Sequence, residues 1–215
     1  MQVDKLIQAV SIGAIPILFA ITLHEAAHGY VAKHFGDMTA YLQGRISLNP
    51  IRHIDPLGTV VLPILTLALG GVLFGWAKPV PVNFGALRNP KKDMLWVALA
   101  GPVSNFAMGL IWALLYKLSL AMPSNYFAEP LMDMAVIGIK INSVLLVLNL
   151  LPLPPLDGGR VALSLLPHKQ AYMLNRIEPY GMFVLIVLAI SPVLGWVLFP
   201  LVELLENFLL MMVGV

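Results

Sequence analysis

The 215-residue sequence contains no cysteine and few charged residues. Without cysteine the chain forms neither disulfides nor thiolate metal sites, so a bound metal must use histidine, carboxylate or water ligands. Charged residues make up 11% of the chain and hydrophobic residues 59%, which is far from the composition of a soluble domain. The net charge of +2 is small and dispersed, and we expect no nucleic-acid partner. The composition predicts a single membrane-embedded domain over residues 1–215.

Long apolar runs define the candidate membrane segments. They cover residues 6–33, 57–74, 94–118, 134–151 and 180–213. The last run is long enough for a kinked span and a short helix, with Pro192 and Pro200 as breaks. We therefore predict an all-α polytopic membrane protein with about four to six transmembrane or re-entrant helical segments. Alternating stretches between these segments predict short β-like hairpins in the membrane-associated loops.

The topology depends on segment 57–74, which Pro63 and a Gly70-Gly71 pair interrupt. If this segment crosses the membrane, the ends of 6–33 and 134–151 lie on opposite faces. If it re-enters and returns, both ends lie on one face, together with most of the lysine and arginine residues. The positive-inside rule then makes that face cytoplasmic. We favour re-entry.

Within the first apolar segment, residues 24–28 read His-Glu-Ala-Ala-His. Residues four apart share one face of a helix, so His24 and His28 can bind one metal ion. This H-E-x-x-H arrangement predicts two imidazole ligands for zinc and Glu25 as the general base. The alternative is a chance match on a buried helix whose histidines are satisfied by hydrogen bonds. Ionisable side chains are costly at membrane depth, and this cost favours the functional interpretation.

Catalytic zinc usually has three protein ligands, so a third residue is needed. The candidates are the remaining histidines, His34, His53 and His168, and a few carboxylates. Asp157 is the best candidate because it follows the proline-broken end of an apolar segment. An aspartate before two glycines can equally cap the helix that starts near Arg160. Chemistry alone leaves both interpretations open, and we expect His34 and His53 to be loop residues.

Three motifs together carry a family resemblance. HEAAH, AGPVSN at residues 100–105 and NLLPLPPLDGG at residues 149–159 occur in the order typical of the site-2 protease family, which comprises intramembrane zinc metalloproteases. The stretches GRISLNPIRHIDPLG and FGWAKPVPVN also resemble short bacterial and archaeal members. The resemblance covers residues from about 20 to 165.

The resemblance implies a ligand set and a mechanism. His24, His28 and Asp157 would hold one zinc ion, and Glu25 would act as the base. Asn149 would face the site and help to hold the substrate or the transition-state oxyanion; its alternative role is an interhelical hydrogen bond. Asn105 is expected to serve helix packing.

The implied function is hydrolysis of peptide bonds within or near the transmembrane helices of membrane-protein substrates. We expect a catalytic core over about residues 6–165 and C-terminal membrane helices over 180–213. The lipid bilayer is the expected surrounding, in a prokaryotic plasma membrane with the active site nearer the cytoplasmic face. The length leaves no room for a PDZ or CBS domain, and the segment WAKPVPVN is expected to pair with extended substrate. Two alternatives stay open: a membrane-embedded metal transporter, and a scaffold that binds membrane helices without cleaving them.

Overall fold

The computed structural model describes residues 2–61, 75, 77–123 and 127–215, and helices dominate these residues. The long helices are α1 (Gln2–His34), α4 (Pro90–Ala121), α5 (Ala128–Asn149) and α9 (Pro192–Val213). The shorter ones are α2 (Thr39–Leu42), η1 (Pro50–His53), η2 (Pro56–Val61), η3 (Phe84–Ala86), α6 (Asp157–Leu165), α7 (His168–Asn175) and α8 (Glu178–Ile190). Each of the four long helices contains a stretch that is long and apolar enough to cross a membrane. The prediction of an all-α polytopic membrane protein is confirmed.

Local sequence signals set the ends of these helices. Gly36, at a φ of 109°, adopts the left-handed conformation that ends α1. Helix α4 starts with Pro90 in its first turn, and the Asp93 carboxylate accepts the backbone N–H of Asn89 at 2.7 Å. Pro192 separates α8 from α9 as predicted, but Pro200 lies inside α9 and does not break it.

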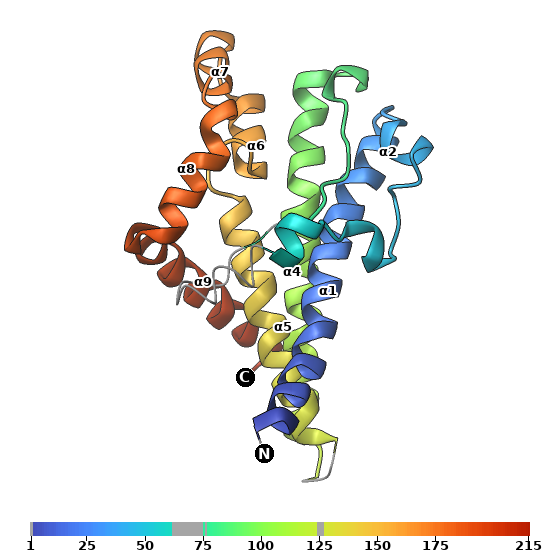
Figure 1. Cartoon of the computed structure of the whole chain (residues 1–215), viewed down its shortest axis with the longest axis vertical. Coiled ribbons are helices and arrows are strands. Elements are labelled where there is room, and N and C mark those ends of the chain that lie inside the picture. Colours follow the sequence, from blue (N-terminus) through green and yellow to red (C-terminus); the bar gives the residue numbers. More distant parts are fainter. Residues whose placement is uncertain (1, 62–74, 76, 124–126) are drawn as a thin grey trace.

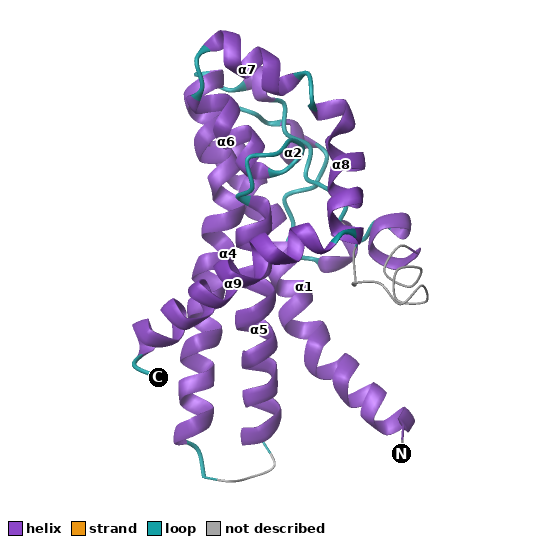
Figure 2. Ribbon diagram, turned by 90° about the vertical axis from the view of Figure 1, so that its left-hand side faces the viewer, coloured by secondary structure: helices purple, strands orange, loops and turns teal. Residues whose placement is uncertain are grey.

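Helices α4, α5 and α9 share an apolar core, and α1 packs against α4 and α5. In Figure 2, α4 and α5 run side by side, whereas the N-terminal half of α1 diverges from them. The Trp112 ring lies directly on α5 at Gly138, where an added Cβ would come within 2.3 Å of the ring. Small residues of this kind allow membrane helices to approach closely.

The expectation of β-like hairpins is not confirmed, because the described residues contain no strand. Side chains, and not a second strand, form hydrogen bonds with the backbone of residues 78–80. The Arg45 guanidinium donates to the carbonyl oxygens of Lys78 and Pro79 at 3.0 and 3.2 Å. Val80 donates its backbone N–H to the Glu25 carboxylate, and prolines 79 and 81 have no N–H to donate. Residues 77–83 therefore pair with no second strand among the described residues.

Backbone hydrogen bonds close the connection between α1 and α4 on itself. Lys78 donates its N–H to the carbonyl oxygen of His53 at 2.9 Å, and Arg88 donates to that of Phe35 at 3.0 Å. A single crossing between residues 53 and 78 would separate these groups by about 30 Å. The flanks of segment 57–74 thus lie together, as re-entry requires, although residues 62–74 are outside the described part of the chain. Figure 1 places the end of α1, the start of α4 and α7 at the same end of the molecule.

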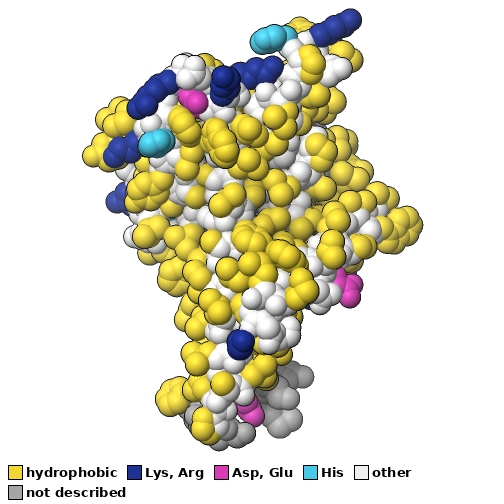
Figure 3. Space-filling view, turned by 180° about the vertical axis from the view of Figure 1, so that it is seen from behind, with side chains coloured by type: hydrophobic (Ala, Val, Ile, Leu, Met, Phe, Trp, Pro, Cys, Tyr) yellow, Lys and Arg dark blue, Asp and Glu magenta, His cyan; other side chains and the backbone are white. Residues whose placement is uncertain are grey.

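Charge and apolar surface are separated along the long axis. In Figure 3, lysine and arginine side chains gather at the end that carries α7, and the sides are mostly hydrophobic. The exposed apolar side chains include Ile111, Leu114 and Leu118 on α4 and Trp196 and Phe199 on α9. Exposed apolar helices of spanning length are those of an integral membrane protein.

Candidate metal centre

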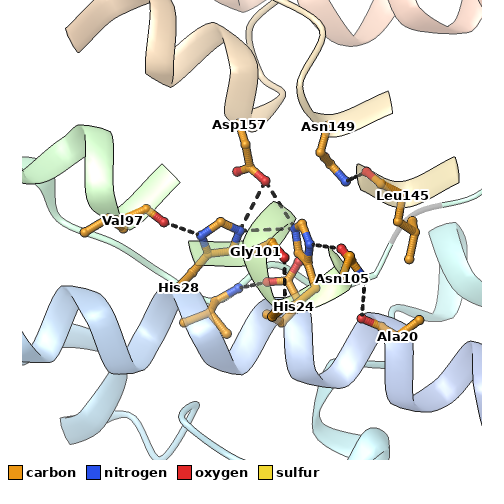
Figure 4. Close-up of polar contacts among 12 residues, drawn as sticks. Ala20, His24, His28, Val97, Gly101, Asn105, Leu145, Asn149 and Asp157 are labelled. Carbon is orange, nitrogen blue, oxygen red and sulfur yellow. Dashed lines mark hydrogen bonds and ion pairs between the residues drawn. The ribbon is translucent and has the colours of Figure 1, made fainter. Parts of the chain in front are cut away.

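His24 and His28 lie one turn apart on α1 and point toward the same space (Figure 4). Their Nε2 atoms are 3.1 Å apart, and their rings meet edge to face with centroids separated by 4.7 Å. Both residues are buried. The helical spacing in the sequence therefore produces the pair of converging imidazoles that it predicts.

Asp157 reaches this pair from the first residue of α6. Its Oδ2 atom lies 3.2 Å from Nε2 of His24 and 3.3 Å from Nε2 of His28. The capping interpretation fails, because Leu156 occupies the N-cap position of α6 and no side chain among the described residues caps this helix. Asp157 therefore completes a cluster of three polar side chains with the two imidazoles.

The glycines after Asp157 allow α6 to start this close to the end of α5. A Cβ on Gly158 would lie 2.3 Å from the carbonyl oxygen of Leu150, and one on Gly159 would lie 2.4 Å from the backbone nitrogen of Pro154. Only glycine fits such backbone contacts. The proline-rich turn and the two glycines together position the Asp157 carboxylate over α1.

Hydrogen bonds at the far side of each ring determine which nitrogen faces inward. Nδ1 of His28 lies 2.7 Å from the backbone carbonyl oxygen of Val97, and Nδ1 of His24 lies 2.6 Å from Oδ1 of Asn105. Both partners are acceptors, so each Nδ1 carries a proton, and the neutral form of each imidazole directs the lone pair of Nε2 inward.

The inward-facing atoms fit a divalent cation. The two Nε2 atoms and Oδ2 of Asp157 all lie within 4.8 Å of one another, and Oδ2 is buried without a hydrogen-bond donor among the described residues. Three lone-pair acceptors that converge in this way can coordinate a cation between them. Two imidazoles and one carboxylate form a ligand set that zinc prefers.

Gly101 of α4 forms the floor of the site. An added Cβ would lie 2.4 Å from Cε1 of His24 and 2.4 Å from Nε2 of His28. Sequence reasoning missed this role and assigned Asn105 to packing alone. Both residues belong to the AGPVSN motif, which was the available signal, but the motif does not say which side chain it contacts.

Glu25 is half-buried on α1 between the two histidines in sequence. Its Oε2 atom accepts the backbone N–H of Val80 at 2.7 Å. The contact connects the carboxylate to segment 77–83.

The other predicted residues lie outside this cluster. In the described part of the chain, the Asn149 side chain has one hydrogen bond, from Nδ2 to the carbonyl oxygen of Leu145 at 2.9 Å. His53 is buried and its Nε2 lies 2.8 Å from the carbonyl oxygen of Ser47, whereas His34 and His168 are exposed. Of the described residues, His24, His28 and Asp157 are the ones that form a group of three potential metal ligands.

Comparison with known proteins identifies several relatives. YwhC of Bacillus subtilis, named as a candidate zinc metalloprotease, is 42% identical over 192 residues, covering 88% of this chain and 84% of YwhC. Rip2 of Mycolicibacterium smegmatis, also named as a candidate zinc metalloprotease, is 34% identical over 86% of this chain and 69% of its own length. The zinc metalloprotease MJ0392 of Methanocaldococcus jannaschii is 26% identical over 73% of this chain but only 35% of MJ0392. No family model and no solved structure matches.

Proposed function

This chain belongs to the site-2 protease family of zinc metalloproteases, and we propose that it cleaves peptide bonds within or near the transmembrane helices of membrane-protein substrates. The observation that carries the proposal is the convergence of two imidazole nitrogens and one carboxylate oxygen, all within 4.8 Å, beside helices of membrane-spanning length. His24, His28 and Asp157 are the residues that would hold the zinc ion. Zinc bound there supplies Lewis acidity, which polarises a scissile carbonyl group and lowers the pKa of water.

Glu25 is the proposed general base. A carboxylate beside the ligand pair takes a proton from the attacking water and returns it to the leaving amine. The N–H of Val80 holds Oε2 of Glu25, and Oε1 is proposed to take part in proton transfer. Asn149 is proposed to hold the substrate or the oxyanion, which requires its amide to leave the carbonyl oxygen of Leu145 when substrate binds.

Segment 77–83 is proposed to pair with the substrate. Proteases bind extended backbone, and the segment has further carbonyl groups for it besides those of Lys78 and Pro79, which accept from Arg45. Because Pro79 and Pro81 lack N–H groups, the substrate must donate most of the hydrogen bonds. A substrate helix must therefore unwind to free its own N–H groups.

The proposed location is a prokaryotic plasma membrane, with the active site nearer the cytoplasmic face. The support comes from the lysine and arginine side chains at one end of the molecule (Figure 3), which the positive-inside rule assigns to the cytoplasm. The start of α4 and α7 belong to the same end.

The direct test is Glu25→Gln in the full-length chain. We expect the variant to keep its zinc, measured by elemental analysis, and to lose cleavage of a single-span model substrate by about 10²–10⁴-fold, because the proton acceptor is missing. The unchanged protein treated with a chelator serves as the zinc-free control. Cleavage at the unchanged rate would contradict the role of Glu25. Zinc binding without any cleavage by the unchanged protein would favour the transporter or the scaffold.

A further inference from the structure

Two buried asparagines connect His24 to α5. Asn105 on α4 and Asn142 on α5 are each 1% exposed. Oδ1 of Asn105 lies 2.6 Å from Nδ1 of His24, and Nδ2 of Asn105 donates to Oδ1 of Asn142 at 2.9 Å. Nδ2 of Asn142 in turn donates to the carbonyl oxygen of Gly138 at 2.8 Å. We call Asn105 and Asn142 the amide relay.

The fixed acceptors at its ends give the relay a direction. The carbonyl oxygen of Gly138 can only accept, so it requires the NH2 group of Asn142, and Oδ1 of Asn142 must face Asn105. Asn105 then directs its NH2 group at this oxygen and also at the carbonyl oxygen of Ala20, 3.2 Å away. Oδ1 of Asn105 is left facing His24. A flip of either amide would place two donors or two acceptors together in a buried site, which is costly.

We propose that Asn105 and Asn142 are positioning residues that hold His24 in the tautomer with its proton on Nδ1, and that Asn142 acts through Asn105. The proposal rests on the proposed function, because the tautomer with its proton on Nδ1 leaves the lone pair of Nε2 available to bind zinc. Outer hydrogen bonds of this kind orient a histidine ligand and raise its basicity.

The two histidines differ in how their orientation is secured. His28 donates to the backbone carbonyl of Val97, which has no alternative orientation. His24 donates to a side-chain amide, which can rotate and present NH2 instead of oxygen. Only His24 therefore needs a block against this rotation, and the amide of Asn142 supplies it together with the carbonyl oxygen of Ala20.

The test compares zinc affinity in purified full-length variants by competition with a chelator. We expect Asn105→Leu to weaken zinc binding by about 10–100-fold, the usual effect of removing an outer hydrogen-bond partner. Asn105→Asp keeps an acceptor for Nδ1 of His24, and in the protonated form its second oxygen still donates toward Asn142, so this variant should retain most of the affinity. Asn142→Leu should weaken binding, but it should add nothing in the Asn105→Leu background, because residues acting in series are not additive.

A matched control and a spectroscopic readout separate this role from packing. Ser143 is fully buried beside Asn142, and its hydroxyl has no partner among the described residues, so Ser143→Ala should leave zinc affinity unchanged. Nitrogen-15 NMR of the zinc-free protein should show His24 with its proton on Nδ1, and Asn142→Leu should shift part of the population to the Nε2–H form. Thermal unfolding identifies variants that fail to fold. If Asn105→Leu is one of them, the zinc affinity of Asn105→Asp still tests the proposed role of Asn105.

The outcomes distinguish the relay from the proposed function. No zinc binding by the unchanged chain would overturn both. Zinc binding that Asn105→Leu leaves intact, or additive effects in the double variant, would overturn the relay and leave the protease proposal standing. Loss of affinity in Asn105→Asp equal to that in Asn105→Leu would also overturn it.

Discussion

At the residue scale, the contact of Gly101 with both imidazoles is the closest constraint on the metal centre. The α4 backbone touches the rings of His24 and His28 because residue 101 has no side chain. One methyl group would push at least one imidazole away from Asp157. The absence of a Cβ atom at residue 101 of α4 thus allows His24 and His28 on α1 to keep their positions.

We predict that Gly101→Ala destabilises the fold by about 1–3 kcal/mol, a typical cost of overpacking, and lowers zinc occupancy. Gly109→Ala is the matched control on the same helix. Its added Cβ would meet the end of the Leu209 side chain, at 2.8 Å, and not a ligand. Elemental analysis and thermal unfolding of both variants provide the measurement. Normal zinc content in Gly101→Ala would refute the contact.

A second residue-scale prediction concerns the third ligand. Asp157→Ala should reduce zinc affinity by more than the about 10–100-fold loss expected for an outer partner, because a direct ligand is removed. His34→Ala and His53→Ala should leave it unchanged, since neither histidine lies in the cluster. Dialysis against buffered zinc measures all three. If His53→Ala strips the metal and Asp157→Ala retains it, the ligand assignment is wrong.

At the scale of elements, the connection between α1 and α4 determines whether the ligands can meet. The hydrogen bonds from Lys78 to His53 and from Arg88 to Phe35 close this connection on itself. Helices α4 and α5 then cross and return, which brings α6 and Asp157 to the His28 end of α1 (Figure 1).

We therefore predict that the loops around Arg45, Lys91 and Lys169 all face the cytoplasm. The chain has no cysteine, so a single cysteine can be introduced in each loop without background labelling. An impermeant thiol reagent should label none of the three in intact cells and all of them after lysis. A cysteine in the loop after Ala121, at the opposite end of α4, is the positive control for outside labelling. Reaction of the Lys91 loop alone from outside would mean that segment 57–74 spans the membrane.

At the scale of the whole molecule, a metal ion held by α1 and α6 cross-links parts of the chain that are distant in sequence. Binding to the folded state alone stabilises it by mass action, by about 2.7 kcal/mol at a zinc concentration 100 times the dissociation constant. For a chain of this size, this corresponds to several degrees in Tm.

We predict that a chelator lowers the Tm of the detergent-solubilised protein and that added zinc restores it. Asp157→Ala should show neither response, whereas Glu25→Gln should behave like the unchanged protein, because Glu25 is not a proposed ligand. A chelator-insensitive Tm in a protein that binds zinc would contradict a structural link between α1 and α6 through the metal.

Local sequence alone was sufficient for the features that depend on short-range rules. The length of the apolar runs predicted the membrane helices, because a helix must be long enough to cross the hydrocarbon layer. The spacing of His24 and His28 predicted their common face, since helix geometry relates residues four apart. The absence of cysteine restricted the ligand types to nitrogen and oxygen.

Only the tertiary structure decided how separate segments meet. Asp157 could be a ligand or a cap by local rules, and its approach to His24 and His28 excludes the cap. Asn105 contacts His24 across 81 residues of chain, a pairing that helix packing creates and no local pattern encodes. The alternating stretches predicted hairpins, but the Arg45 side chain and the Glu25 carboxylate took the available hydrogen bonds. Short-range periodicity determines elements, whereas the partners of each polar group depend on which elements pack together.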